Sequence, residues 1–507
     1  MPEKANETTN FQREDTQSYG QIAKSAGIFA GSQGVNMAAG IVRTKVLALL
    51  LGPAGIGLVG LYQSVIDVVK SIASLGLSFS AVKDIAQATA SNDEKKLAET
   101  VTVTRRLVWW TSALGTVLML LFSRPISEYV FEDQQHVLPI CLLSFCVLTG
   151  LISSGQMALL QGSRRLLEMA KASVYGTLIG LVVAVTLYAW LGINGIVPAL
   201  MGLSVVSLVF SWFFTRHIRG SQVRMTIREI GSKGSAMIKL GVSSMLSGLA
   251  ATCAMMLVKS FILKETHQED MVGLYQAVWS LSAMYIGALL SAMSMDYYPR
   301  LCSLEKDEKA MVAFANQQTR FVMLVSTPLV VGVLLFSSLI LRLFYSSSFL
   351  AANDLMQLQI LGTFFKLAIW PAAFFLLAKG KGGRFLLSEV SWYVVYYAAT
   401  RLLWPQYGLL GAGIAFVLAY AVYCPLVVML VRPFCAIKLT PSNVRLLAFL
   451  TLMTIGVFLV VFFLEGMLKW SLASALCLAV CIVCLVELNK IVPLGVVLKK
   501  LQQWKKR

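Results

Sequence analysis

Five basic residues lie inside long apolar stretches of the sequence, where a charge is costly. They are Arg43 and Lys45 in the first stretch, Lys70 in the second, Lys259 in the seventh and Lys366 in the tenth. A charged side chain at the centre of a membrane helix costs about 2.5–3.5 kcal/mol or more, so it usually faces a cavity or a partner. Arginine binds phosphate through a two-pronged contact, and lysine binds it as a point charge. These residue types predict a binding site for an anionic headgroup such as phosphate or pyrophosphate.

Some of these positions also have a simpler interpretation, which the sequence leaves open. Arg43 and Lys45 could extend along the helix to the membrane surface, where their charges would be hydrated. Lys70 follows Asp67 by three residues, so the two share a helix face and could neutralise each other. In the alternative, the pair changes partners during transport.

Acids are scarce in the apolar stretches, and two of them, Asp67 and Asp296, are candidates for ion coupling or gating. Lys366 has no acid close to it in the sequence, which favours its exposure to a cavity. A lining with several cations and few acids suits an anionic substrate. An inside-negative membrane potential favours outward movement of an anion by about 2.3 kcal/mol per charge per 100 mV. We therefore expect no cofactor, with coupling either to this potential or to a gradient of H⁺ or Na⁺.

The composition predicts that these charges lie on membrane-spanning helices. Hydrophobic residues make up 57% and charged residues 13% of the 507 residues, whereas a soluble domain is about 25% charged. A bilayer core needs about 20 apolar residues in a helix. Fourteen stretches approach this length, at about 25–50, 54–81, 105–123, 137–161, 168–190, 194–215, 236–262, 271–296, 320–342, 354–378, 384–403, 408–431, 443–464 and 468–488. The predicted fold class is an all-α integral membrane protein with about 14 transmembrane helices.

Lysine and arginine are distributed unevenly between the predicted loops. Of the 43 in the chain, 32 fall in segments on the side that holds both termini, and five fall in loops on the other side. Because basic loops remain in the cytoplasm, we expect both termini to be cytoplasmic. The same bias explains the net charge of +18. The sequence has no basic stripe with interleaved aromatic residues, so we do not expect it to bind nucleic acid.

Seven residues occur twice in the chain and indicate an internal duplication. The sequence VGLYQSV at 59–65 returns as VGLYQAV at 272–278, and Arg43 and Lys259 hold matching places before the two copies. Parallel repeats of this kind are typical of transporters whose substrate site lies between two halves. We expect two pseudo-symmetric six-helix lobes plus a C-terminal helix pair. The predicted domains are a polar cytoplasmic tail (1–20), an N-lobe (21–219), a C-lobe (220–435) and the last two helices with a basic cytoplasmic tail (436–507).

No group of residues in the sequence predicts catalysis or metal binding. Cys481 and Cys484 have the spacing of a metal or redox pair, but they lie in an apolar run and are expected to act as small apolar residues. The three histidines all fall in predicted loops. No nucleophile–base pair is evident, and no G-x-x-x-x-G-K-[ST] phosphate loop occurs. We therefore expect a transporter and not an enzyme.

The stretch RTKVLALLLGPAGIG, residues 43–57, resembles a known family. It is similar to Wzx-type polysaccharide (O-antigen) flippases of the multidrug/oligosaccharidyl-lipid/polysaccharide exporter superfamily, which have a lysine before a short apolar run and a GPAG-type turn. Lipid II flippases of the MurJ type carry an arginine nine residues before the turn glycine, as Arg43 does before Gly52. In that family the arginine faces a central cavity and helps to bind lipid pyrophosphate, which the resemblance implies for Arg43. Fourteen spans match the MurJ type, whereas the turn and the long charged tail match the Wzx type.

The resemblance implies a flippase of the bacterial inner membrane. Such a protein moves an undecaprenyl-pyrophosphate-linked oligosaccharide from the inner to the outer leaflet by alternating access, for O-antigen (lipopolysaccharide) or another surface polysaccharide. The implied partners are this lipid-linked substrate, membrane lipids, a polysaccharide polymerase and a chain-length regulator. Two alternatives stay open. A MATE-like drug or cation antiporter would carry acids in its cavity, and a membrane glycosyltransferase or polymerase would carry carboxylates in a large outside loop.

Overall fold

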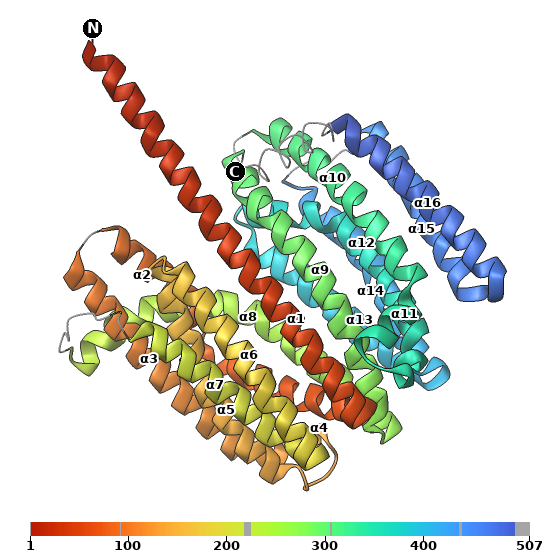
Figure 1. Ribbon diagram of the computed structural model, residues 1–507, viewed down its shortest axis with the longest axis horizontal. Coiled ribbons are helices and arrows are strands. Elements are labelled where there is room, and N and C mark those ends of the chain that lie inside the picture. The colour runs from red at the N-terminus through yellow and green to blue at the C-terminus, as the bar shows by residue number, and fades with distance from the viewer. Residues whose placement is uncertain are drawn as a thin grey trace. The chain divides into compact units, whose positions relative to one another are not determined.

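All regular secondary structure in the described part of the chain is helical. The computed structural model describes residues 2–91, 93–216, 218, 225–304, 307–434 and 439–491. In chain order the elements are α1 (Pro2–Ser74), α2 (Leu77–Ala90), α3 (Glu94–Leu121), α4 (Ser123–Val130), α5 (Val137–Gly162), α6 (Leu166–Leu191), η1 (Gly192–Gly195), α7 (Ile196–Thr215), α8 (Ile227–Thr266), α9 (Glu269–Ser303), α10 (Glu308–Leu335), α11 (Ser337–Phe344), η2 (Ser347–Ala352), α12 (Asn353–Ala378), α13 (Gly382–Tyr407), α14 (Leu409–Val431), α15 (Pro441–Phe463) and α16 (Gly466–Ile491) (Figure 1).

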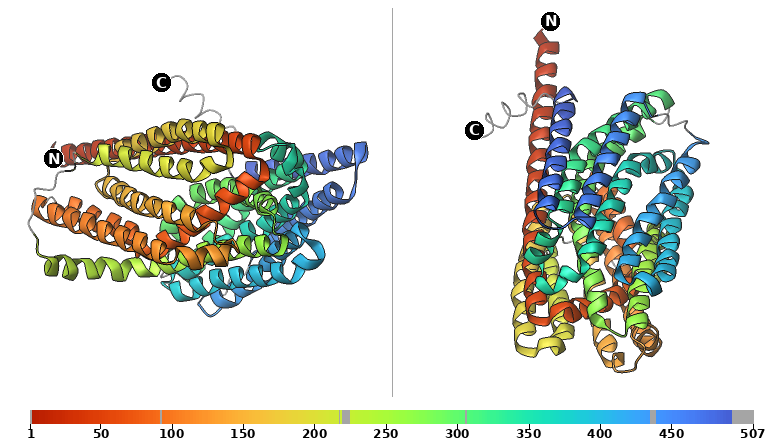
Figure 2. Two further views of the ribbon diagram at one scale, coloured as in Figure 1. Left: turned by 90° about the horizontal axis from the view of Figure 1, so that it is seen from below. Right: turned by 90° about the vertical axis from the view of Figure 1, so that its right-hand side faces the viewer.

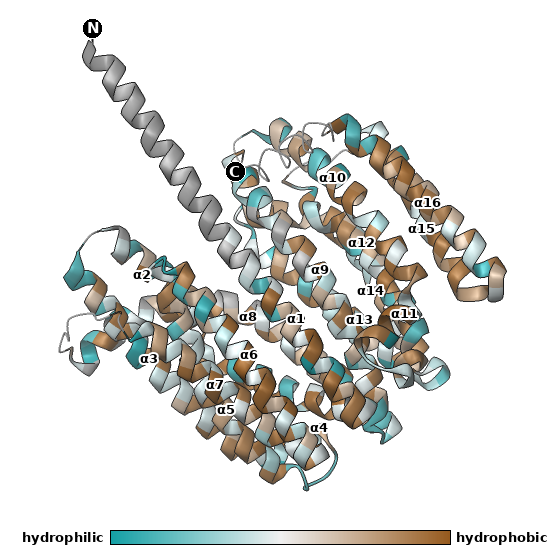
Figure 3. Cartoon of the chain, viewed as in Figure 1, coloured by the Kyte–Doolittle hydropathy of each residue, from teal (hydrophilic) through white to brown (hydrophobic). Residues whose placement is uncertain are grey.

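The helices have the length and composition of membrane spans. Within the described ranges, 9 helical segments are long and apolar enough to cross a bilayer, or 10 if α3 and α4, bent by 61°, count as one. Two of the 9 segments are long enough to cross the bilayer twice, since about 20 residues suffice for one crossing. They are Gly31–Ser74 with 44 residues and Leu166–Thr215 with 50. Figure 3 shows apolar residues along α15 and α16 and hydrophilic residues at the turn between α2 and α3. The predicted all-helical membrane class is confirmed, and the count of fourteen spans stays a prediction.

Helix α1 breaks at Gly52, where the sequence predicts a turn. Gly52 has φ 64° and ψ −161°, a conformation that glycine adopts without the steric penalty of a Cβ. Pro53 follows at the first position of the next helical part, where its missing N–H has no intrahelical partner to lose. The break separates the part of α1 that carries Arg43 from the part that carries Asp67 and Lys70.

The chain divides into two compact units, each considered by itself. The first unit holds Met1–Met256 and Ile262–Asp270, and the second holds Leu257–Phe261 and Met271–Arg507. The division thus falls within α8. The predicted lobe boundaries at 219/220 and 435/436 lie outside the described residues.

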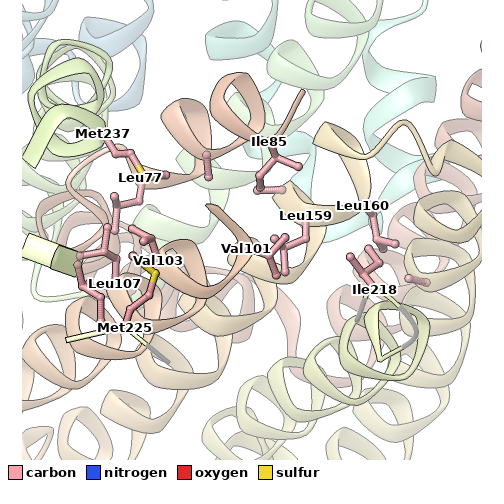
Figure 4. Packing of buried hydrophobic residues seen from close by; sticks show 14 residues of the cluster. Leu77, Ile85, Val101, Val103, Leu107, Leu159, Leu160, Ile218, Met225 and Met237 are labelled. Atoms are coloured by element: carbon pink, nitrogen blue, oxygen red, sulfur yellow. The ribbon is translucent and has the colours of Figure 1, made fainter. Parts of the chain in front are cut away.

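In the first unit, α5 packs against α1, α2, α3 and α7, and α6 packs against α1 and α7. A buried apolar cluster joins α2, α3, α5 and α8 near the start of α3 (Figure 4). Ile218 and Met225, which follow α7, are part of this cluster. Two arginines of α3 bind the same segment, because Arg105 Nη2 donates to the carbonyl oxygen of Ile218 (3.3 Å) and Arg106 Nη1 to that of Met225 (2.9 Å).

In the second unit, α12 packs against α10 and α14, and α13 pairs with α14. The last two helices, α15 and α16, form a hairpin that packs on α10 (Figure 2). Polar groups fix this contact. Arg320 of α10 forms an ion pair with Glu487 of α16, and its Nη1 donates to Ser442 Oγ at 3.0 Å. Asn443 Nδ2 donates to the carbonyl oxygen of Asn316 at 2.9 Å.

The internal duplication is visible in the local structure of the two units. Asp93 caps α3 and Asp307 caps α10, 214 residues later. The short helices α4 and α11, of 8 residues each, also begin 214 residues apart. Gly192 and Gly408 end α6 and α13 with φ values of 58° and 54°. These features recur at nearly one offset, so they support the predicted repeat independently of the VGLYQ motif.

The repeated motif has the same structural role in both copies. Gln63 Nε2 donates to Asp67 Oδ1 at 2.8 Å, and Gln276 Nε2 donates to Ser280 Oγ at 2.8 Å. Both motif tyrosines are buried; Tyr62 Oη lies 2.7 Å from His136 Nδ1, and the hydroxyl of Tyr275 bonds to another tyrosine. Burial lowers the pKa of His136, although Asp133 opposes the shift. The motif therefore packs each unit internally.

The close contact between α8 and the turn that precedes α2 gives a test of the first unit. Gly76 has φ +67°, and a Cβ added there would lie 2.0 Å from the carbonyl oxygen of Gly241. The substitution Gly76→Ala should destabilise the protein by about 2 kcal/mol or more, because the left-handed conformation costs about 1–2 kcal/mol and the overlap adds to it. Thermal unfolding of the purified protein in detergent measures this.

Gly231→Ala is the matched control, because a Cβ at Gly231 in α8 meets nothing within 4 Å. We expect it to keep or raise the melting temperature, since alanine favours the helix by about 1 kcal/mol. Equal melting temperatures for Gly76→Ala and the unchanged protein would contradict the contact between Gly76 and Gly241.

Candidate functional site

Arg43 lines a polar cavity in the first unit. The cavity has a volume of about 360 Å³ and is formed by α1, α5, α6 and α7. Its lining residues are Asn36, Ala39, Gly40, Arg43, Met157, Ala172, Ser173, Gly176, Thr177, Leu181, Leu203, Ser207 and Ser211. The only charged residue among them is Arg43. Hydroxyl groups of α6 and α7 provide most of the remaining polarity.

The groups around Arg43 are partly satisfied by one another. Asn36 Nδ2 donates to Ser173 Oγ at 2.6 Å, while Asn36 Oδ1 is buried without a hydrogen-bond partner. Ser207 Oγ lies 3.0 Å from Ser153 Oγ. Arg43 itself is half-buried and forms no ion pair with a described carboxylate. A guanidinium with unused donors, surrounded by hydroxyl groups, can bind a phosphate oxygen without separating an existing ion pair.

Asp67 and Lys70 lie in the second part of α1, after the break at Gly52, and make different contacts. Asp67 accepts a hydrogen bond from Gln63, and Lys70 extends toward α5. A Cβ built on Gly150 of α5 would lie 2.2 Å from Lys70 Nζ, so the ammonium group occupies space that the glycine leaves open. Lys45 is half-buried, and neither it nor Lys70 lines the Arg43 cavity.

Lys366 lines a cavity in the second unit, as predicted. This cavity has a volume of about 380 Å³ and lies among α9, α12, α13 and α14. Its wall is mainly aromatic, with Trp279, Trp370, Phe374, Phe385, Trp392, Tyr393, Phe416, Tyr420 and Tyr423. The charged residues in the lining are Lys366 and Glu389.

Glu389 is a cavity residue that the sequence did not identify as a neighbour of Lys366. The two residues are 23 positions apart but interact electrostatically, because α12 and α13 both border the cavity. Tyr423 Oη of α14 donates to Glu389 Oε1 at 2.7 Å. The acid was visible in the sequence as a rare carboxylate within a predicted span. Only the packing of the helices places it beside Lys366.

The structure leaves two other predicted site residues apart from the cavities. Lys259 is 6% exposed in α8, and Phe261, two residues later, packs edge-on against Trp404. Asp296 is exposed near the end of α9 and pairs with Arg300, with 3.0 Å between Oδ1 and Nε. Exposed pairs of this kind contribute about 0–1 kcal/mol. Gating or ion coupling by Asp67 and Asp296 stays a prediction.

Lys259 and Arg43 still hold corresponding positions in the two copies of the repeat. Gly52 ends the first part of α1 with a positive φ, and His267 ends α8 with φ 50°. Arg43 lies nine residues before Gly52, and Lys259 lies eight before His267. The two cations therefore occupy matching places to within one residue of the repeat.

Comparison with known proteins finds related sequences and folds. Residues 46–354 match the sequence model of the family described as "Polysaccharide biosynthesis protein". The lipid III flippase of Escherichia coli (strain K12) is 24% identical over 406 residues, which is 79% of this chain and 96% of the relative. A Shigella flexneri protein whose name proposes O-antigen transport is 24% identical over 380 residues, or 73% of this chain and 88% of the relative.

The fold is also similar to a solved structure. The lipid II flippase MurJ, in an inward closed conformation, aligns with a TM-score of 0.69 over 91% of this chain and 98% of that chain, at 11% identity. At this identity the alignment shows the fold alone. Together these similarities confirm the resemblance to polysaccharide flippases that the sequence predicts.

The second-unit cavity can be tested without reference to function. The substitution Lys366→Met leaves Glu389 in a largely aromatic wall without its neighbouring cation, which should lower the melting temperature. Glu389→Gln in the same protein removes the uncompensated charge. We expect the loss of stability in the double variant to be smaller than the sum of the losses in the two single variants, with a coupling energy of about 0.5–3 kcal/mol. Strictly additive shifts in melting temperature would mean that the two side chains do not interact.

Proposed function

Because this chain belongs to the polysaccharide biosynthesis protein family, we propose that it is a flippase for a lipid-linked oligosaccharide. It moves an undecaprenyl-pyrophosphate-linked sugar from the inner to the outer leaflet of the bacterial inner membrane. The product then serves O-antigen or another surface polysaccharide. The near-complete coverage of a lipid III flippase by this chain supports the proposal.

The observation that carries the proposal is the cavity around Arg43. It combines one guanidinium with hydroxyl groups, and no carboxylate is among its described lining residues. Arginine forms two parallel hydrogen bonds with phosphate, and the bonds are stronger because both partners are charged. Arg43 therefore binds the pyrophosphate, and Ser173 and Thr177 donate hydrogen bonds from their hydroxyls.

The other predicted cations complete the anion-binding role. Lys45, Lys70 and Lys259 supply positive charge along the path of the headgroup, and Lys259 is the counterpart of Arg43 in the repeat. Movement follows the alternating-access scheme of transporters with internal repeats, in which one half rocks against the other. The membrane potential or an ion gradient drives the cycle. A polymerase and a chain-length regulator are the partners that such a flippase would serve.

The second-unit cavity suits the sugar part of the substrate. A pocket with a mainly apolar wall and a few polar groups is typical of small-molecule sites. Here Trp279 and Trp392 provide flat apolar faces, while Glu389 accepts and Lys366 donates hydrogen bonds. A sugar ring has one face of C–H groups and a rim of hydroxyls, so it matches this combination.

One observation favours a second candidate function, a drug or cation antiporter. Glu389 is an acid in a cavity, and such an acid is what an antiporter requires to bind a cation. Lys366 in the same cavity opposes this, because its ammonium group already interacts with Glu389. The flippase is therefore the function that the geometry supports best.

Arg43→Ala tests the flippase directly. We expect a reduction of about ten-fold or more in surface polysaccharide, with lipid-linked oligosaccharide accumulating in the inner leaflet, because hydrogen bonds between charged groups are each worth about 1.5–3 kcal/mol. Arg43→Lys should retain part of the activity, since lysine keeps the charge but not the two-pronged contact. Surface polymer and inner-leaflet lipid-linked sugar are measured at equal protein levels.

The matched control is Arg124→Ala, which removes an exposed arginine paired with Glu128 outside either cavity. It should leave polymer production unchanged. Full activity of Arg43→Ala would contradict the proposed phosphate site. Export of a cationic drug that depends on Glu389, without any effect on lipid-linked sugar, would establish the antiporter instead.

Filling the cavity provides a second test. Gly40 lines the Arg43 cavity, and a Cβ there meets nothing within 4 Å, so Gly40→Leu should fold and occupy the space beside the guanidinium. We expect loss of polymer production with an unchanged melting temperature. Gly34→Leu is the control, because Gly34 also has open space but does not line the cavity. Equal polymer production by both variants would show that the substrate does not enter this cavity.

A further inference from the structure

A second cavity of the first unit shares no lining residue with the Arg43 cavity. It has a volume of about 510 Å³ and lies among α3, α5 and α7. Its polar lining residues are Thr104, Arg105, Gln156 and Arg216, and its aromatic residues are Trp109 and Trp212. Both charged residues in the lining are arginines. The cavity is therefore positively charged and has no function in the transport scheme above.

Three polar groups of this cavity have unused hydrogen-bonding capacity. Arg105 Nη2 donates to the carbonyl oxygens of Thr215 and Ile218, but its Nε is buried without a partner. Gln156 is 8% exposed and its Oε1 has no partner, and the hydroxyl of Thr104, 1% exposed, also has none. Buried polar groups in proteins are nearly always hydrogen-bonded, and an amide can present either its oxygen or its nitrogen after a flip. These groups point to a bound polar molecule.

The order of residues along α7 matches the layers of a membrane. Arg216 lies at the end of the helix, and its guanidinium carbon is 4.0 Å from the ring centre of Phe213. One turn earlier Trp212 is 58% exposed, and a further turn inward Val209 is 51% exposed. Arginine at the headgroup level, tryptophan at the interface and aliphatic residues below are typical of a helix surface in contact with lipid.

Helix α3 repeats the arginine and tryptophan part of this order, and its arginine reaches the end of α7. Arg105 binds the carbonyl oxygen of Thr215, so its guanidinium lies at the end of α7, near the level of Arg216. Trp109, one turn further along α3, is 56% exposed. Two arginines at the headgroup level and two exposed tryptophans one turn deeper thus frame one cavity.

We propose that this cavity binds the phosphodiester headgroup of an anionic phospholipid. Basic pockets between transmembrane helices on the cytoplasmic side bind such headgroups, and this end of α7 lies on the side predicted to be cytoplasmic. Arg216 and the free Nε of Arg105 bind the phosphate oxygens, and Gln156 binds the glycerol or phosphate. The acyl chains lie along Trp109 and Trp212. The site is independent of the proposed flippase function, and the lipid strengthens the end of α7 that Arg105 already holds.

Lipid binding to the purified full-length protein tests the site. Phosphatidylglycerol added in mixed micelles should raise the melting temperature and remain bound in native mass spectrometry, whereas phosphatidylcholine should do neither. Arg216→Gln should weaken phosphatidylglycerol binding about five-fold, the effect of one basic residue near a membrane surface. Arg216→Glu should abolish it. Because Arg216 is exposed, both variants should fold.

Arg165→Gln is the matched control, because Arg165 is an exposed arginine at the start of α6 that does not line the cavity. It should bind phosphatidylglycerol as the unchanged protein does. Equal phosphatidylglycerol binding by Arg216→Glu and Arg165→Gln would overturn the proposal. So would a variant at Arg216 that keeps phosphatidylglycerol but loses a polyprenyl pyrophosphate, because the cavity would then belong to the transported lipid.

Discussion

Hydrocarbon can neither hydrate a charge nor form a hydrogen bond with a backbone N–H or C=O group. Helices satisfy their own backbone groups, which is why every described element is helical. Side-chain cations require space and polar neighbours. Arg43 and Lys366 accordingly line cavities, and Lys70 extends into the space left by Gly150. Charge in this protein is placed where packing leaves room for it.

Duplication produced two units with one plan and different interiors. The capped starts of α3 and α10 and the short helices α4 and α11 recur at the same offset. The cavities differ in chemistry, since hydroxyl groups surround Arg43 and aromatic rings surround Lys366 with Glu389. Two units that share one plan thus enclose cavities of different chemistry.

The arginines of α3 show how one side chain can serve both structure and binding. Arg105 and Arg106 donate to backbone carbonyls of the segment that follows α7. These bonds use only part of the guanidinium of Arg105, and its Nε borders a cavity with Arg216. A lipid phosphate there would complete the hydrogen bonding of a residue whose structural role is already established by its backbone contacts.

The membrane class, the helix break at Gly52 and the internal repeat could be predicted from the amino-acid sequence, because apolar length, glycine–proline chemistry and register are local properties of the chain. The sequence also favoured a cavity position for Lys366, since a cation without a local acid in an apolar stretch has few other stable locations, whereas the cavity position of Arg43 was implied by the family resemblance. The sequence did not predict that Glu389 lies beside Lys366 or that Asp296 forms an exposed pair with Arg300. It also did not predict the cavity that Arg105 and Arg216 line among α3, α5 and α7. Those outcomes depend on which helices pack together and at what rotation. Residues far apart in the chain become neighbours through helix packing, which their spacing in the sequence does not encode.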